Sequence, residues 1–280
     1  MNMNLQALTC VLVVGITPNV AKAFEFTGGV ELGYSQTDTG NSDDGENLSL
    51  NGPSGSAFVT VGLEDWRATL DVNHIGRSLP AGDAFDSYAP ENATAYGLHI
   101  GRQFGSAYFG GFYGKTRFQG SDAATFNGYV DGDLYGIEAS QDLSFGSIFG
   151  QVGQAKMIGD GTDTAFDGLF FRVGVNANLG NQINLITGYE RGSSPGIFED
   201  EGDSGSYERF DLTAEYPFGD RVIGQVGFQM TDFQANTEDL GSETTIRVGL
   251  RIPLGKTSRR NDLKTTYLPG LAAAWAEVLD

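Results

Sequence analysis

Apolar and polar residues alternate along most of the chain from Phe24 onwards, which is the pattern of a β-strand with two different faces. In the first such segment Phe24, Phe26 and Val30 share one face with Leu32 and Tyr34. The same period of two predicts strands within residues 24–35, 57–63, 66–72, 96–100, 106–114, 135–139, 147–155, 169–177, 183–189, 210–216, 222–230 and 246–252. The chain is therefore expected to be all-β with about twelve strands.

The segments between these strands fall into two classes of length that alternate along the chain. Short joins are expected near residues 64–65, 102–105, 141–146, 179–182 and 217–220. Long, polar and acidic joins are expected near residues 38–53, 75–93, 115–133, 156–168, 192–206 and 231–243. Short turns on one side and long loops on the other are typical of an antiparallel, up-and-down transmembrane β-barrel.

The first 23 residues have the pattern of a secretory signal peptide. An apolar stretch from Leu5 to Val20 is too short for a membrane span, and it ends in the small-x-small sequence Ala21-Lys22-Ala23. Cleavage there would leave a chain that begins at Phe24 and has no cysteine, because Cys10 is the one cysteine of the sequence. No later run of 18 apolar residues predicts a transmembrane helix.

Composition narrows the function further. The sequence has 36 acidic and 17 basic residues, a net charge of −19, so it would repel a nucleic-acid backbone. Its 41 glycines also weigh against a helical protein, because glycine destabilises helix interiors.

Four features separate a membrane barrel from a soluble sandwich. Several runs reach the nine to eleven residues that a tilted transmembrane strand needs, and aromatic residues collect near strand ends. The apolar face of the clear runs carries no charge, and the even strand number puts both ends of the barrel on the side of export. A soluble, secreted β protein stays the less favoured alternative.

With its signal peptide, its opening strand Phe24–Tyr34 and its rhythm of strands and loops, the chain resembles the outer-membrane porin-like β-barrels of Gram-negative bacteria. The resemblance implies a barrel over residues 24–254, inserted in the outer membrane after export to the periplasm. Lipid and lipopolysaccharide are then its surroundings, and a homo-oligomer is compatible with the pattern although nothing marks an interface.

The tail, residues 255–280, departs from that class. Such barrels usually end on an aromatic residue, whereas Thr244–Leu254 does not and a further 26 residues follow. The tail begins with basic residues, and its end has apolar residues at helical spacing. We expect a short periplasmic helix docked at the barrel mouth, and the alternative is a plug or membrane-surface anchor.

Motifs for catalysis or metal binding are weak. Two Gly-Lys-Thr triplets, at 114–116 and 255–257, lack the preceding glycine of a phosphate-binding loop. The segment Asp131–Gly136 begins like an EF-hand but has Tyr135 at a ligand position. His74 and His99 are far apart without a third metal ligand or a nearby serine in the pattern of barrel hydrolases. We expect no enzyme activity, cofactor or metal.

The polar face of the strands is expected to line the interior. Its candidate pore-lining residues are Glu25, Glu31, Arg67, Asp71, His99, Glu138, Arg172, Glu190, Arg209, Asp211, Glu215, Arg247 and Arg251. Closure of the last strand on the first would bring Arg247 and Arg251 beside Glu25 and Glu31. Either these charges lock a filled interior, or arginines on one wall face carboxylates on the other across a water-filled pore.

The combined reading is a passive, porin-like channel for small hydrophilic solutes. Twelve strands lie between the filled small barrels and the open large ones, and glycines on the inner face, such as Gly174 and Gly188, are expected to leave room for a narrow channel. Acidic loops favour a mild preference for cations. The alternatives are a non-conducting structural or surface-binding barrel and, less favoured, the soluble protein.

Overall fold

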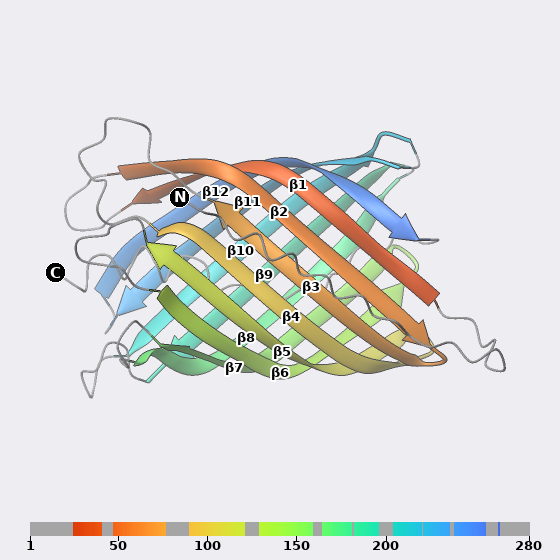
Figure 1. The fold of residues 1–280 in the computed structure, drawn as a ribbon, viewed down its shortest axis with the longest axis horizontal. Coiled ribbons are helices and arrows are strands. Elements are labelled where there is room, and N and C mark those ends of the chain that lie inside the picture. Colours follow the sequence, from red (N-terminus) through yellow and green to blue (C-terminus); the bar gives the residue numbers. More distant parts are fainter. Residues whose placement is uncertain are drawn as a thin grey trace, which may run out of the picture.

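A closed barrel of twelve antiparallel strands forms the body of the molecule in a computed structural model (Figure 1). The structure describes residues 25–40, 47–76, 90–120, 129–158, 164–180, 182–195, 204–219, 221–235 and 238–255, together with Leu263. Each strand pairs with the next along the chain, and the last closes on the first. The all-β, up-and-down barrel expected from the alternating pattern is therefore confirmed.

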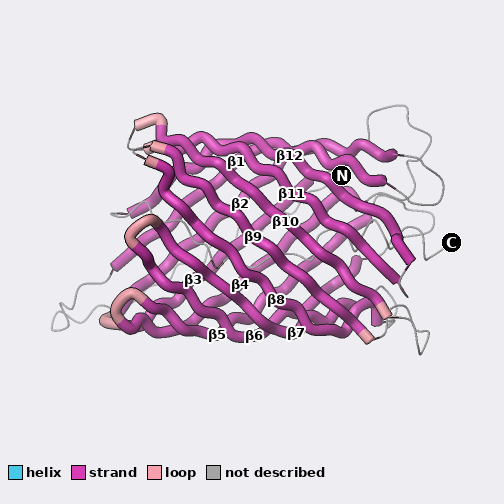
Figure 2. The backbone as a smooth tube through the Cα atoms, turned by 180° about the vertical axis from the view of Figure 1, so that it is seen from behind, coloured by secondary structure: helices cyan, strands magenta, loops and turns pink. Residues whose placement is uncertain are grey.

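The strands are longer than the alternating runs alone indicate. They are β1 (Glu25–Gly40), β2 (Asn47–Leu63), β3 (Trp66–Gly76), β4 (Pro90–Phe104), β5 (Ala107–Gly120), β6 (Tyr129–Leu143), β7 (Gly146–Ile158), β8 (Thr164–Leu179), β9 (Ile183–Ser194), β10 (Gly205–Pro217), β11 (Ile223–Ala235) and β12 (Glu238–Gly255). Figure 2 shows them crossing the barrel wall at a steep tilt.

The tilt follows from the register of the pairs. A path that starts at Glu25 and steps from strand to strand through the paired residues returns to β1 at Thr39, fourteen residues further on. With about 3.3 Å per residue and about 4.8 Å between strands, this stagger gives a tilt of about 40°. The backbone cylinder is then about 24 Å across, which is wide enough to hold two facing layers of side chains.

Tight turns lie at one rim of the barrel, and both ends of the barrel chain meet there. All five connections at this rim are short, and Gly105 and Gly180 adopt left-handed φ angles of 63° and 69° that favour glycine. Thr27 of β1 pairs with Gly255 of β12 at the same rim. Both ends of the barrel therefore lie on the same side, as the even strand number predicts. In an outer-membrane barrel the rim with the short turns is the periplasmic one.

The long connections at the other rim are shorter than predicted. The join expected over 231–243 shrinks to residues 236–237, because β11 continues to Ala235 and β12 starts at Glu238. Likewise β1 reaches Gly40 and β2 starts at Asn47. At these outer ends the outward residues, such as Ser49 and Asp232, are polar, and the apolar Leu50 and Phe233 point inwards. The apolar outer face that marks the rest of each strand is therefore missing, but the backbone groups still satisfy each other in the ladder.

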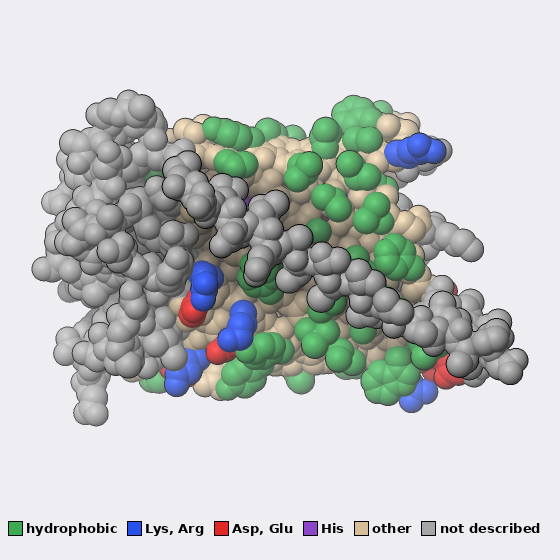
Figure 3. All heavy atoms as spheres, in the orientation of Figure 1, with side chains coloured by type: hydrophobic (Ala, Val, Ile, Leu, Met, Phe, Trp, Pro, Cys, Tyr) green, Lys and Arg blue, Asp and Glu red, His purple; other side chains and the backbone are tan. Residues whose placement is uncertain are grey.

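The outward face of the barrel is apolar through its middle and charged towards its rims. Large apolar side chains such as Leu70, Val173, Val226 and Val248 are more than half exposed there. Figure 3 shows them spread over the wall, with the visible charged side chains towards the two rims. Because an exposed apolar band of this extent is unfavourable in water, the surrounding medium is lipid.

Polar and aromatic side chains mark the edges of this band. Outward ion pairs join Arg117 Nε to Asp131 Oδ1 at 2.6 Å and Arg191 Nη1 to Glu208 Oε1 at 3.0 Å on the loop side. On the turn side Trp66 and Phe218 are exposed. Rings at both interfaces and charges beyond them are typical of transmembrane barrels.

Several sequence predictions fall outside the described residues. These are the signal peptide over 1–23, residues 77–89 of the join expected at 75–93, most of the acidic loop residues and, except for Leu263, the tail after Gly255. Among the described residues no helix is long and apolar enough to cross a membrane.

Candidate functional site

The interior of the barrel holds every candidate residue that the polar face predicts. Eight of them are buried: Asp71, His99, Glu138, Arg172, Glu190, Arg209, Glu215 and Arg251. The others are partly or fully exposed and lie on the same inward face of their strands: Glu25, Glu31, Arg67, Asp211 and Arg247. The period of two explains this placement, since alternate residues of a strand point to one side of the sheet.

Many of these charges lie on one row across neighbouring strands. Glu138, Gln151, Arg172, Glu190 and Arg209 are direct register partners on β6, β7, β8, β9 and β10. Adjacent positions on such a row are about 5 Å apart, so opposite charges can pair along the wall. Carboxylates and arginines therefore alternate along the second half of the row, from Arg172 to Arg209.

The arginines of this row pair with carboxylates on their own wall. Arg209 Nη2 lies 2.7 Å from Glu190 Oε2, and Arg172 Nη2 lies 3.4 Å from Asp211 Oδ1. Tyr207 donates its hydroxyl to Glu190 Oε1 at 2.9 Å. The hypothesis of arginines on one wall facing carboxylates on the other is wrong for these residues, because a buried charge is stable only when a counter-charge lies within hydrogen-bond reach.

A second cluster surrounds His99 and shares Glu138 and Gln151 with this row. Its Nε2 lies 2.8 Å from Asp71 Oδ2 and its Nδ1 2.7 Å from Glu138 Oε2. Glu138 also accepts hydrogen bonds from Tyr108 at 3.1 Å and from Gln151 at 3.0 Å. Both ring nitrogens of His99 thus lie within hydrogen-bond distance of a carboxylate oxygen. The cluster joins five neighbouring strands of the wall, β3 to β7, and borders the cavity inside the barrel.

The seam between the first and last strands agrees with one half of the prediction. Arg251 is the register partner of Glu31, as expected, whereas Arg247 lies opposite Ser35. Glu25 precedes the first β1–β12 pair and lies opposite Gly62 of β2 instead. The stagger of the barrel causes this difference, because it moves the end of β1 beyond the reach of β12.

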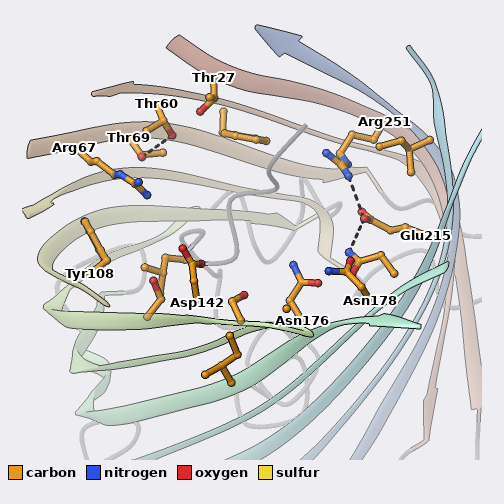
Figure 4. A pocket seen from close by; sticks show the side chains of 18 of the residues that line it. Thr27, Thr60, Arg67, Thr69, Tyr108, Asp142, Asn176, Asn178, Glu215 and Arg251 are labelled. Carbon is orange, nitrogen blue, oxygen red and sulfur yellow. Dashed lines mark hydrogen bonds and ion pairs between the residues drawn. The ribbon is translucent and has the colours of Figure 1, made fainter. Parts of the chain in front are cut away.

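Arg251 also forms an ion pair with a residue outside the seam. Its Nη2 lies 3.1 Å from Glu215 Oε2, two strands along the wall, and Asn184 Nδ2 donates to the same oxygen at 3.1 Å (Figure 4). This pair is almost fully buried, with 3% and 2% of the two side chains exposed. Such a pair is costly to break, because each buried charge would lose a counter-charge at hydrogen-bond distance.

A polar cavity of about 940 Å³ opens inside the turn-side half of the barrel. We call it the vestibule. Figure 4 shows Arg67, Tyr108 and Asp142 pointing into it from one side and Glu215 with Arg251 from the other. It extends from the turn residues at the rim inwards to the cluster around His99 and Glu138. Its threonines, asparagines and paired charges suit water and small hydrophilic solutes.

Glycines of the inner face do more than leave room. A side chain placed on Gly192 would meet the Tyr207 ring at 2.2 Å, and one on Gly174 would meet the Phe149 ring at the same distance. The expectation that inner glycines simply widen the lumen is therefore incomplete. Large rings lie flat on the wall across these glycines, and a β-carbon there would displace them.

Some residues of the interior escaped prediction. Tyr108 and Phe149 lie on strands with glycine and phenylalanine on both faces, so the alternation that would have placed them is blurred. Asn184 is not among the predicted pore-lining residues because it is uncharged. It points inwards because it lies an even number of residues from Glu190 on β9. Within the described ranges, no group of three or more His, Cys, Asp and Glu side chains could hold a metal ion.

Comparison with known proteins gives the fold class. No family model matches the chain. No curated protein matches it. It is similar to an outer membrane channel from Pseudomonas putida F1, with a TM-score of 0.51 and 10% identity over 85% of this chain and 100% of that one.

Two further solved structures are similar at lower scores. The loop L8 deletion mutant of OmpT from Vibrio cholerae has a TM-score of 0.44 and 12% identity over 83% of this chain and 99% of that one. The anion-selective porin from Comamonas acidovorans has a TM-score of 0.43 and 10% identity over 83% and 99%. Together with the closed, apolar-surfaced barrel, the similarity to the outer membrane channel shows the fold of an outer-membrane β-barrel.

Proposed function

We propose that this barrel is a passive channel for small hydrophilic solutes, with a mild preference for cations. The observation that carries the proposal is the vestibule, a polar cavity of about 940 Å³ inside a wall whose outer face suits lipid. A polar interior within an apolar exterior provides a route for solutes that lipid tails exclude. The proposal contains no catalytic step.

The interior beyond the vestibule favours hydration over a dry plug. Arg172 is 3% exposed, yet its Nε and Nη1 have no hydrogen-bond acceptor within the described part of the chain. A buried donor without a partner is costly, so these N–H groups favour water or a polar solute beside them. Narrow passage along this wall would restrict the channel to small solutes.

The cation preference rests on the charge of the inward face. In the described ranges its carboxylates outnumber its arginines. The carboxylates are Glu25, Glu31, Asp71, Glu138, Asp142, Glu190, Asp211, Glu215 and Glu243, and the arginines are Arg67, Arg172, Arg209, Arg247 and Arg251. A net negative lining raises the local concentration of cations and lowers that of anions. We therefore expect a reversal potential on the cation side in a salt gradient.

We also propose that the outer face of the barrel contacts lipopolysaccharide. Beyond the apolar band, Lys115 Nζ lies 3.4 Å from Asp133 Oδ1 and Lys156 Nζ lies 3.8 Å from Asp167 Oδ2 on the outward face. These four residues are register neighbours on β5, β6, β7 and β8. Their exposed charges match the level of lipid headgroups, so they suit phosphate groups and bridging cations there.

The second candidate is a non-conducting structural or surface-binding barrel. The observation in its favour is that the side chains on the row from Glu138 to Arg209 are almost fully buried. Liposome swelling separates the two candidates. Vesicles that contain the protein should swell in arabinose faster than in a trisaccharide, whereas equal rates to empty vesicles for every sugar would favour the structural barrel.

A further inference from the structure

Two opposite charges at the turn-side mouth of the vestibule lie near each other without pairing. Arg67 of β3 points into the vestibule (Figure 4), and Glu25 of β1 also lines it. Neither side chain forms an ion pair or a hydrogen bond with another residue that the structure describes. Further inside the same cavity, by contrast, Arg251 is paired with Glu215 at 3.1 Å. The guanidinium group and the carboxylate at the mouth are therefore able to bind a solute.

The register of the sheet places these two charges on one row. Glu25 is opposite Gly62 of β2, and Gly62 is opposite Arg67 of β3. The backbones of the two charged residues are therefore about 10 Å apart, which is twice the spacing of neighbouring strands. Gly62 lines the vestibule and has no side chain, so the inward face between the two charges is open to the cavity.

The same row continues inwards from Arg67 over Gly101 and Gly110. The ring of Tyr108 covers both glycines, because a β-carbon on Gly101 would lie 2.6 Å from its Cζ and one on Gly110 2.5 Å from its hydroxyl oxygen. That hydroxyl donates a hydrogen bond to Glu138, the next residue on the row. A solute at the guanidinium group therefore borders an aromatic ring on this side and the acidic side chain of β1 on the other.

The wall beside the two charges is polar and uncharged. Thr27, Thr60 and Thr69 lie opposite one another on the neighbouring inward row, and all three line the vestibule. The hydroxyl groups of Thr60 and Thr69 share a hydrogen bond of 2.8 Å. Because a hydroxyl can both donate and accept, this wall suits either end of a polar solute.

We propose that Arg67 and Glu25 form a binding site for small zwitterionic solutes, which carry one carboxylate and one ammonium group. Arg67 donates hydrogen bonds to the carboxylate, and Glu25 accepts them from the ammonium group. A zwitterion satisfies both charges at once, whereas an anion is repelled by Glu25 and a cation by Arg67. Passage of the bound solute through the barrel rests on the proposed channel function, whereas binding at the mouth does not.

Three probes of similar length test the site in the intact protein in detergent micelles. At neutral pH 4-aminobutyrate is a zwitterion, butyrate an anion and butylammonium a cation. Saturation-transfer NMR titrations should give a dissociation constant for 4-aminobutyrate about fivefold lower than for either other probe, the upper end of what one exposed ion pair contributes. Binding of butylammonium as tight as that of 4-aminobutyrate would overturn the proposal, because the net negative lining alone would then explain it.

Exchange of the two charges separates a specific pair from the general field of the cavity. Arg67→Gln and Glu25→Gln should each weaken the binding of 4-aminobutyrate about fivefold. Arg67→Glu combined with Glu25→Arg keeps the net charge and should restore binding that Arg67→Glu alone abolishes. The matched control is Arg102→Gln, which changes an exposed arginine on the outward face of the next strand and should leave binding unchanged. Unchanged binding in Arg67→Gln, or an equal loss in the control, would overturn the proposal.

Liposome swelling in 4-aminobutyrate separates the site from the channel. If the protein binds the zwitterion preferentially but its vesicles swell in no solute, the site stands and the proposed channel function fails. If the vesicles swell but the three probes bind equally, the channel stands and the zwitterion site is wrong.

Discussion

An arginine at Val173 provides a quantitative test of which medium meets the outer face of the barrel. Val173 points outwards from β8 and is half exposed. It lies six residues from Leu179 at the turn-side end of the strand and six from Asp167, which pairs with Lys156 on the loop side. At about 3.3 Å per residue and a tilt of about 40°, each distance is about 15 Å along the membrane normal.

Val173 is therefore at the middle of an apolar band about 30 Å tall, which matches the hydrocarbon core of a bilayer. An arginine at the midplane of a transmembrane barrel destabilises it by about 2–4 kcal/mol, and one near the interface by about 0–1 kcal/mol. Val173→Arg should thus lower the free energy of unfolding by about 2–4 kcal/mol. Leu179→Arg, on the same strand and face, should lower it by less than about 1 kcal/mol.

The assay is reversible guanidinium unfolding of the protein in phospholipid vesicles, with linear extrapolation to zero denaturant. The difference between the two variants carries the test, because errors in the common reference state cancel. Equal costs at the two depths would refute a bilayer around this face. Recovery of either variant as a water-soluble monomer without detergent would refute it as well.

Other variants test the packing of the interior by the same unfolding assay. Gly192→Ala should cost about 1–3 kcal/mol, because its β-carbon would lie 2.2 Å from the buried Tyr207 ring, and the cost should fall in a Tyr207→Ala background; an equal cost in both would contradict the contact. Glu215→Gln should cost up to about 3–5 kcal/mol, because it removes the carboxylate 3.1 Å from the buried Arg251 guanidinium, and Glu215→Gln with Arg251→Gln should recover part of that; a double variant worse than the single one would contradict it. Arg102→Gln removes an exposed ion pair at the rim and should cost less than about 1 kcal/mol, so a larger loss would show a buried role.

Sequence alone was sufficient to predict the strand number and the direction of the side chains. Along β8, for example, Val173 and Arg172 point to opposite sides because lipid and the interior select opposite residue types at successive positions. The outer ends of the strands were missed, because beyond the lipid the outward face no longer needs to be apolar, so the pattern of an apolar outer face and a polar inner face is lost. The join at 231–243 was therefore expected as a loop although most of it is paired.

The sequence also could not predict which side chains contact each other inside the barrel. Parity placed Arg172 and Asp211 on the inner face, but their ion pair depends on the stagger between β8 and β10, which no single strand encodes. The contact of Leu263 with the interior depends on the path of a tail without any alternating pattern. The pattern of hydrophobic residues predicts whether a strand face contacts lipid or the interior. It does not predict which polar partner a residue has in the interior.

Current through planar bilayers tests the proposed water-filled path most directly. Purified protein should give discrete current steps, and in a gradient of potassium chloride the reversal potential should have the sign of a cation-selective pore. A barrel that is folded by heat-modifiable gel mobility, yet passes no current, would contradict the proposed channel.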